Sequence, residues 1–258
     1  MGRYARIALY VSLLLVVAGC GKPDDGHYID NEVGCMSASQ VVVCGQWEKF
    51  LNNVTGYTFS FNKDGFVDTV RYRGGYASFV YYAGSREVQT VGNDMVDLRL
   101  HDMDGVVNTV CTFVIGVNGY AKRCTEVRVA DNRRYDWRFK YDRSGYLTSL
   151  DAAGDECEFE YVDGNLVAYT NWCDGEETYV FTYSSLSSFG YMPYFQSPGY
   201  IEADYGPILP LAYFAGLVGR PSKNLPSVCD VYVDDEYVRS YEYRYVFNND
   251  GELVNMYY

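Results

Sequence analysis

Imidazole chemistry is confined to two side chains, because the sequence contains only His27 and His101. A serine hydrolase of the Ser-His-Asp type would have to use His101 as its base, since His27 lies in a polar segment that we expect to be a tether. The sequence also lacks the Gly-x-Ser-x-Gly pattern, whose strained turn exposes the nucleophile of α/β-hydrolases. We therefore expect no catalysis of this type.

Carboxylates are numerous, and two of their patterns suggest chemistry. The run Asp102–Gly105 resembles a fragment of a calcium loop, but Leu100 takes the preceding ligand position and Cys111 takes the position of the closing glutamate. We interpret this run as a turn, and we expect neither a metal nor a cofactor. Acidic groups at three predicted turns or strand junctions could supply the carboxylate pair of a glycosidase, although solvated charge is their usual role. These groups are Asp155-Glu156, Glu176-Glu177 and Asp234-Asp235-Glu236.

Eight cysteines offer sulfur chemistry. Two pairs each bracket a predicted turn and are the disulfides that export to an oxidising compartment would allow; alternatively, these thiols are buried as small apolar groups. The pairs are Cys111 with Cys124 and Cys157 with Cys173. Cys35 and Cys44 are a third, local possibility for a disulfide, and we expect Cys229 to stay unpaired. No spacing has the paired Cys-x-x-Cys form of a zinc site.

The eighth cysteine, Cys20, follows a segment typical of secretion signals. Basic residues precede an apolar run from Ile7 to Val17, which is shorter than the roughly 18 to 20 residues that span a bilayer. The small residues before Cys20 resemble the lipobox of bacterial lipoproteins, in which the cysteine is acylated and becomes the mature N-terminus. We therefore expect residues 1–19 to be a cleaved signal peptide and Cys20 to carry a lipid that anchors the protein to a membrane.

The segment 20–39 begins with polar, turn-forming residues, which is typical of a flexible tether. A lysine and two aspartates at positions 22–25 are similar to the acidic export signal of surface lipoproteins in Bacteroidota, although Pro23 interrupts them. We expect a lipid-anchored location at the outer membrane, on the cell surface or, alternatively, on the periplasmic face. The formal net charge of −13 and the scattered basic residues argue against a nucleic-acid partner.

One structural unit recurs in residues 40–258, which we interpret as a single domain. Alternating aromatic residues precede a turn that contains Asn or Asp and ends in Gly, and an apolar return strand follows. Glycine supplies the positive φ that these turns need. Alternation places Trp137, Phe139 and Tyr141 on one face of a strand, so each unit is predicted to be a β-hairpin with one aromatic face. The clearest copies are Tyr57–Val67, Tyr135–Leu147, Cys157–Val167 and Tyr241–Leu253.

Proline-rich residues at about 184–240 interrupt this pattern. Within them, Leu209–Gly219 is predicted to be a short apolar helix that covers the sheet, since it is only about half as long as a membrane span. Aromatic residues of this insertion are not explained by strand alternation, so they either face a ligand or fasten the insertion to the sheet. They are Tyr191, Tyr194, Phe195, Tyr200 and Tyr205.

The lipobox, the aromatic hairpins and the segment Leu217–Pro226 together resemble an uncharacterised family of Bacteroidota lipoproteins described as having a porin-like fold. The likeness extends roughly from Tyr57 to the C-terminus. The hairpins are also similar, more loosely, to the tyrosine-aspartate repeats of large secreted shells. The resemblance implies no catalytic residue.

The sequence therefore predicts an all-β fold: an up-and-down antiparallel meander, strongly curled or barrel-like, with one short inserted apolar helix. Our leading functional hypothesis is a non-enzymatic envelope lipoprotein that presents a binding surface to a glycan or to another envelope protein. A structural or assembly component of the outer membrane is the alternative. A carboxylate-dependent hydrolase is the third hypothesis.

Overall fold

The computed structural model describes residues 58–63, 66–72, 74–82, 95–152, 154–172, 175–187, 207–247, 249 and 253–257. The chain divides into two compact units, Met1–Asn31 and Glu32–Tyr258, and every described residue belongs to the second unit. The signal peptide, the tether and the lipid on Cys20 concern residues outside this set and stay predictions.

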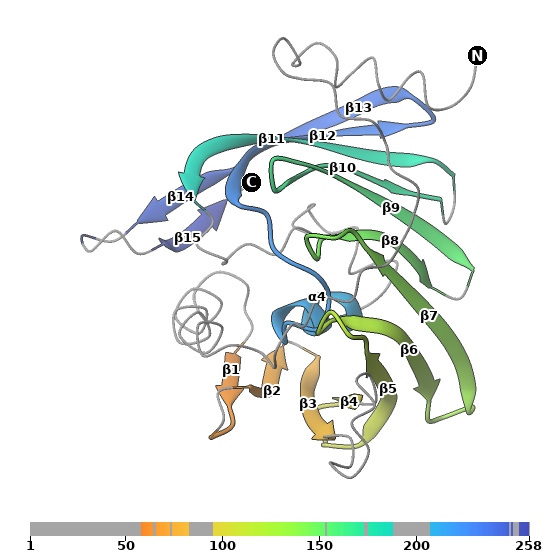
Figure 1. Ribbon diagram of the computed structural model, residues 1–258. Helices are drawn as coiled ribbons and strands as arrows, with labels where there is room; N and C mark the ends of the chain where they lie inside the picture. Colours follow the sequence, from red (N-terminus) through yellow and green to blue (C-terminus); the bar gives the residue numbers. More distant parts are fainter. Residues whose placement is uncertain are drawn as a thin grey trace. The chain divides into compact units, whose positions relative to one another are not determined.

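Thirteen antiparallel strands form one sheet in which every strand pairs with its neighbours in the sequence (Figure 1). β1 and β13 are its two edges, so the sheet is curled but not closed. The predicted all-β meander is confirmed, in its curled and open form. A separate two-stranded sheet follows, formed by β14 (Arg244–Phe247) and β15 (Leu253–Tyr257). The strands of the large sheet are β1 Thr58–Phe61, β2 Val67–Tyr72, β3 Gly75–Tyr82, β4 Met95–His101, β5 Val107–Ile115, β6 Ala121–Arg128, β7 Arg133–Tyr141, β8 Leu147–Ala152, β9 Asp155–Val162, β10 Asn165–Asn171, β11 Glu177–Ser187, β12 Asn224–Val233 and β13 Glu236–Glu242.

Alternation along the strands separates an apolar inner face from a charged outer face. On β7, Trp137 and Phe139 are only 3% and 5% exposed, whereas Asp136, Arg138 and Lys140 between and beside them are exposed. Burial of each aromatic side chain contributes on the order of 2–3 kcal/mol, so strands of this kind build a continuous core. The sheet therefore needs a cover for its inner face.

The cover is a short helix, α4 (Ile208–Phe214), which begins and ends earlier than the predicted Leu209–Gly219. It stops because Gly216 has a φ of +73°, and the backbone N–H groups of Gly216 and Leu217 donate to the carbonyls of Tyr213 and Ala212 at 2.8 and 2.9 Å. This hydrogen-bond pattern is the Schellman motif, in which a left-handed glycine ends a helix.

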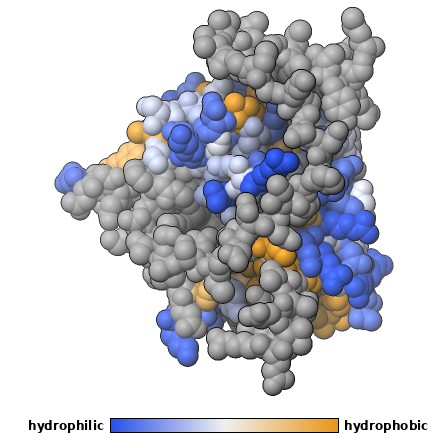
Figure 2. All heavy atoms as spheres, viewed as in Figure 1, coloured by the Kyte–Doolittle hydropathy of each residue, from blue (hydrophilic) through white to orange (hydrophobic). Residues whose placement is uncertain are grey.

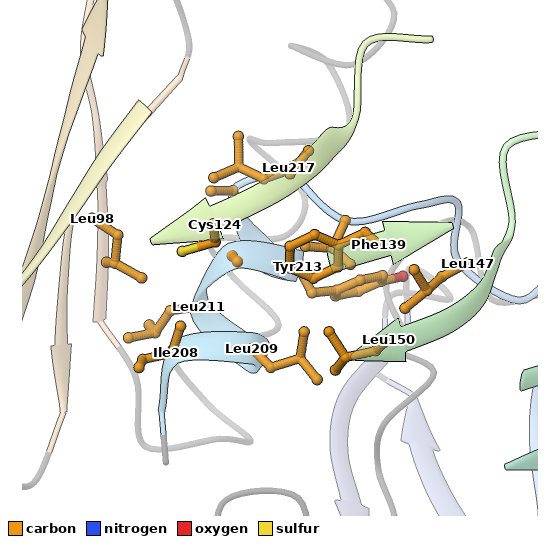
Figure 3. Close-up of a cluster of buried hydrophobic side chains, with 14 of the residues drawn as sticks. Leu98, Cys124, Phe139, Leu147, Leu150, Ile208, Leu209, Leu211, Tyr213 and Leu217 are labelled. Carbon is orange, nitrogen blue, oxygen red and sulfur yellow. The ribbon is translucent and has the colours of Figure 1, made fainter. Parts of the chain in front are cut away.

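Helix α4 is buried against the inner face of the sheet (Figure 3). Leu209 and Leu211 are at most 1% exposed, and they lie in one hydrophobic cluster with Leu98, Phe139 and Leu150 from strands β4, β7 and β8. The predicted covering role of this apolar segment is therefore confirmed. Among the described residues, no helix is both long enough and apolar enough to cross a membrane.

Residues 217–223, which we call the strap, run from the helix across one end of the sheet to β12. The carbonyl of Leu217 accepts from the N–H of Ala121 at 2.8 Å, at the start of β6. Further along, the N–H of Arg220 donates to the carbonyl of Gly145 at 2.9 Å, in the β7–β8 turn. The N–H of Lys223 then donates to the carbonyl of Gly164 in the β9–β10 turn, also at 2.9 Å. The strap thus fastens three successive hairpins.

Candidate functional site

Tyrosine hydroxyls join neighbouring hairpins at the end of the sheet where the strap lies. Tyr141 on β7 donates to the carbonyl oxygen of Ala121 at 2.7 Å, and Tyr183 on β11 donates to that of Leu166 at 2.7 Å. Each acceptor lies at or near the start of the preceding strand. The hydrogen bond therefore joins the later part of one strand to the start of the strand before it. Tyr81 on β3 makes the equivalent bond to the carbonyl oxygen of Val67 on β2. The hydroxyl of Tyr245, on β14 of the small sheet, donates to the carbonyl oxygen of Pro226 on β12.

Tyr161, at the corresponding position of β9, departs from this pattern. Its hydroxyl is buried without a hydrogen-bond partner, while its ring stacks on Tyr146 with 4.6 Å between the ring centroids. Burial, followed by the nearby hydroxyl of Tyr183, raises the pKa of Tyr161 well above its usual range. Burial likewise raises the pKa of Tyr213 on α4. At neutral pH these phenols are uncharged, so they can hydrogen-bond and stack but cannot act as bases.

His101 has a serine partner on the outer face of the sheet. Ser78 Oγ lies 2.9 Å from His101 Nε2, and His101 Nδ1 lies 3.2 Å from the carbonyl oxygen of Gly105. Because a carbonyl only accepts, Nδ1 carries the proton, and Nε2 accepts from the serine hydroxyl. The imidazole also stacks on Tyr76, with ring centroids 4.2 Å apart and planes 7° apart. The sequence separation of 23 residues concealed this pair.

This serine–histidine pair lacks the surroundings that a hydrolase needs. Its third member is the carbonyl oxygen of Gly105, where the serine hydrolases have a carboxylate. Ser78 lies inside β3, which pairs with β2 on one side and β4 on the other, so the backbone N–H groups around it serve the sheet. An oxyanion hole requires N–H groups directed at the substrate. We therefore interpret the pair as a contact that holds the imidazole in place.

Asp102 uses its carboxylate to build a turn, as the sequence predicts. Its Oδ1 accepts from the backbone N–H groups of Asp104 and Val106, at 2.9 Å each. Asp142 accepts from Ser144 and Tyr146 in the same way, at 2.8 and 2.9 Å. Within the described part of the chain, no group of three His, Cys, Asp or Glu side chains is arranged to hold a metal ion.

The three acidic groups considered for glycoside hydrolysis lie at the same end of the sheet, on β9, β11 and β13 and in the turns before them. Neighbouring groups are two strands apart, which corresponds to roughly 10 Å and exceeds the separation of about 5–9.5 Å in glycosidases. The carboxylate of Glu177 accepts the hydroxyl of Tyr179 at 2.9 Å. Asp234 and Asp235 form the two-residue β12–β13 turn with φ values of +48° and +69°.

Glu126 is a buried carboxylate that our sequence analysis missed. It lies on the inner face at 6% exposure, where it accepts from Trp137 Nε1 and from Arg128 Nε, at 3.3 Å each. The guanidinium of Arg128 also lies 4.7 Å from the centroid of the Tyr135 ring. Cys124, two residues earlier, faces the same way at 1% exposure. Side chains two residues apart on a strand share a face, so a buried Cys124 implies that Glu126 also faces inward. This alternation was the sequence signal that could have found Glu126.

The cysteines of the sheet correct our disulfide predictions. Cys111 and Cys124 are both free thiols in this structure, and a hydrogen bond between them, together with burial, raises the pKa of Cys111. Cys157 is also a free thiol, with its sulfur 3.6 Å from the hydroxyl of Tyr169, whereas Cys173 lies outside the described residues. These thiols fill the apolar face, as the alternative reading holds. Cys229 is free and buried too.

A comparison with known families identifies the family of this chain. A family model described as a domain of unknown function (DUF4595) with porin-like fold matches residues 97–255, from β4 to β15. The chain belongs to this family. The DUF4595 match includes α4, the strap and the strands of the large sheet from β4 to β13, but it assigns no activity to any residue.

Among solved structures, the DUF4595 chain is similar to the crystal structure of a porin-like protein from Bacteroides uniformis. The two share 17% sequence identity with a TM-score of 0.53, over 76% of this chain and 78% of the other. A likeness at this identity concerns the fold alone. None of the curated proteins matches the chain. The aromatic residues predicted to face a ligand, Tyr191, Tyr194, Phe195, Tyr200 and Tyr205, lie outside the described residues, and that prediction stays open.

Proposed function

We propose that this protein is a non-enzymatic, lipid-anchored lipoprotein of the cell envelope that presents a binding surface to a glycan or to another envelope protein. The observation that supports this proposal most is the division of the sheet into a filled inner face and a charged outer face. The inner face is occupied by the chain's own α4, with Leu211 and Ala212 completely buried. The outer face carries exposed charged residues on several strands, among them β6, β7 and β9.

Such an outer face suits contact with water, because lipid-facing strands carry apolar side chains toward the bilayer. On β9, for example, Glu156, Glu158 and Glu160 are all exposed. Figure 2 shows hydrophilic residues beside smaller hydrophobic areas on the visible face of the described chain. A body of this kind needs a separate attachment to a membrane, and the predicted lipid on Cys20 supplies one.

The anchor is tested by feeding cells an alkyne fatty acid and comparing the wild type with Cys20→Ala. We expect the wild-type protein to take up the label and Cys20→Ala to remain unlabelled with its signal peptide attached. Equal labelling of both proteins would refute the lipid anchor.

The binding role is tested on intact cells and on the purified protein. Intact cells are treated with an external protease, and this protein is compared with a periplasmic control. Loss of this protein while the control survives would direct the search to extracellular glycans. Saturable binding to a glycan, or stoichiometric co-purification of an envelope protein, supports the proposal. Absence of both, with a membrane-integrity defect on deletion, would instead favour the structural role.

A further inference from the structure

The outer face of β9 carries an acidic stripe of three unpaired carboxylates. Glu156, Glu158 and Glu160 alternate along the strand and are all exposed. Side chains two residues apart on one face of a strand are separated by roughly 7 Å. None of the three makes an ion pair or a side-chain hydrogen bond to another described residue. Such a stripe weakens the sheet by its own repulsion.

A basic stripe lies on the neighbouring strands β6 and β7. It consists of Arg123, Arg138 and Lys140, which are exposed and form no ion pair with another described residue. The guanidinium of Arg138 does contribute, after Thr125 and Arg134, to lowering the pKa of Asp136 on the same strand. Arg123 is directly opposite Arg138 in the sheet register, an arrangement of like charges that is unfavourable by itself. Our sequence analysis found only scattered basic residues, because cross-strand register brings these three together.

Some charges elsewhere on the same sheet are paired within the chain. Arg134 lies 3.3 Å from Asp136 on β7, and Arg99 lies 3.2 Å from Asp97 on β4. The stripes also occupy matched levels of the sheet. In the register of the sheet, Arg138 is opposite Asp151 of β8, which is opposite Glu156. Lys140 is likewise opposite Ser149 of β8, which is opposite Glu158. Two strand spacings, about 10 Å, separate the stripes.

We propose that the outer face of β6–β9 docks on the same face of a second copy of this chain. The contact is related by a two-fold axis that runs parallel to β8 and between the two sheets. This rotation exchanges the two sides of β8 but keeps each level, so Arg138 faces the partner copy's acidic stripe at the level of Glu156. Lys140 faces the level of Glu158, and each basic stripe thus meets an acidic one twice.

Charge complementarity selects this axis and this occupant. A two-fold axis between the sheets and perpendicular to the strands would place each stripe against the same stripe of the second copy, where like charges repel. An anionic polymer would match only the basic stripe and would be repelled by the acidic one. Asp151 lies beside the axis, and its Oδ1 accepts from the N–H of Gly154 at 3.1 Å. A second copy therefore satisfies both stripes together.

The contact spans few strands of a curved sheet and consists of exposed charges, so it belongs to the small, transient class of interfaces. Its strength depends on salt, because the Debye length falls from about 30 Å at 0.01 M to about 3 Å at 1 M. The proposal concerns the described sheet alone and holds whether or not Cys20 carries a lipid.

The test uses two charge-reversed variants of the full chain and sedimentation velocity at low and high salt. R138E/K140E reverses two of the three charges of the basic stripe, and E156K/E158K reverses two of the three charges of the acidic stripe. We expect the wild type to self-associate at low salt and each variant to lose affinity on the order of a hundredfold, since two contacts reverse on each side of the axis. An equimolar mixture of the two variants should associate again, as a mixed dimer. Circular dichroism and thermal unfolding check that both variants are folded.

Three results would overturn the proposal. The first is a wild type that stays monomeric at low salt and high concentration. The second is a pair of folded variants that self-associate as the wild type does, and the third is a mixture that stays monomeric. Retention of the wild type on a sulfated polysaccharide, without self-association, would assign the basic stripe to an anionic polymer instead.

Discussion

Replacing Gly219 by alanine is expected to destabilise the fold more than replacing Gly119. Both glycines have a positive φ, +68° and +81°, so alanine at either position pays the left-handed penalty of about 1–2 kcal/mol. The positions differ in the space around them. A Cβ on Gly119 would meet nothing within 4 Å, whereas one on Gly219 would lie 3.1 Å from the backbone nitrogen of Leu147 and 3.3 Å from its Cβ.

The backbone of Leu147 cannot move away easily, because this residue begins β8 and is completely buried. Overpacking of a rigid site costs typically about 1–3 kcal/mol. We therefore expect Gly119→Ala to lower the free energy of unfolding by about 1–2 kcal/mol and Gly219→Ala to lower it by about 2–5 kcal/mol. Gly119→Ala is the matched control, since it changes the same atoms at the same kind of backbone conformation.

Urea unfolding followed by tryptophan fluorescence measures the difference between the two variants. The slope of the unfolding free energy against urea concentration should stay that of the wild type, since neither substitution alters the surface exposed on unfolding. Equal destabilisation by the two substitutions would mean that the strap does not lie against β8, and the account of how α4 is held in place would fail.

Three further predictions concern hydrogen bonds and thiols. Tyr141→Phe should lower the free energy of unfolding by about 1 kcal/mol, because it removes the hydrogen bond to the carbonyl of Ala121. Tyr161→Phe should leave the free energy of unfolding unchanged or raise it, because the hydroxyl of Tyr161 has no hydrogen-bond partner. A larger loss for Tyr161→Phe than for Tyr141→Phe in urea unfolding would contradict these contacts. Asp142→Ala should lower the free energy of unfolding by about 1–3 kcal/mol, since the backbone N–H groups of Ser144 and Tyr146 lose their acceptor; an unchanged urea midpoint would contradict this role. Burial raises the pKa of Cys229 from 9.0 to about 12, so the folded state favours the neutral thiol. Below pH 9 the thiol is neutral in the folded and unfolded states alike, and the free energy of unfolding keeps its full value. As the pH rises from 9 toward 12 the thiol ionises only in the unfolded state, so the free energy of unfolding declines. Cys229→Ala should flatten that decline in unfolding curves measured across this range, and an unchanged pH profile would count against the assignment.

Local sequence patterns were sufficient to predict the hairpins, because period-two alternation and glycine turns act over a few residues. The inner position of Trp137 and Phe139 follows from the alternation alone. The end of α4 was placed too late, since Gly216 and Gly219 were both suitable stop signals and only the Schellman hydrogen bonds distinguish them.

Contacts between distant strands could not be predicted in this way. Ser78 meets His101, and the strap meets Gly145 and Gly164, only because the register of the whole meander brings them together. The two charged stripes have the same origin, since Arg123 and Arg138 become neighbours through the pairing of β6 with β7.

The strap also sets an order in which the chain can fold. Strands β1 to β11 pair only with their sequence neighbours, so they can form hairpin by hairpin as the chain emerges, N-terminus first, into the compartment where it folds. Their shared apolar face gains its cover only when residues 208–223 have emerged, long after β4 and β7. Until then a curled sheet with an uncovered aromatic surface exists, and this is the interval in which a chaperone would bind or aggregation would begin.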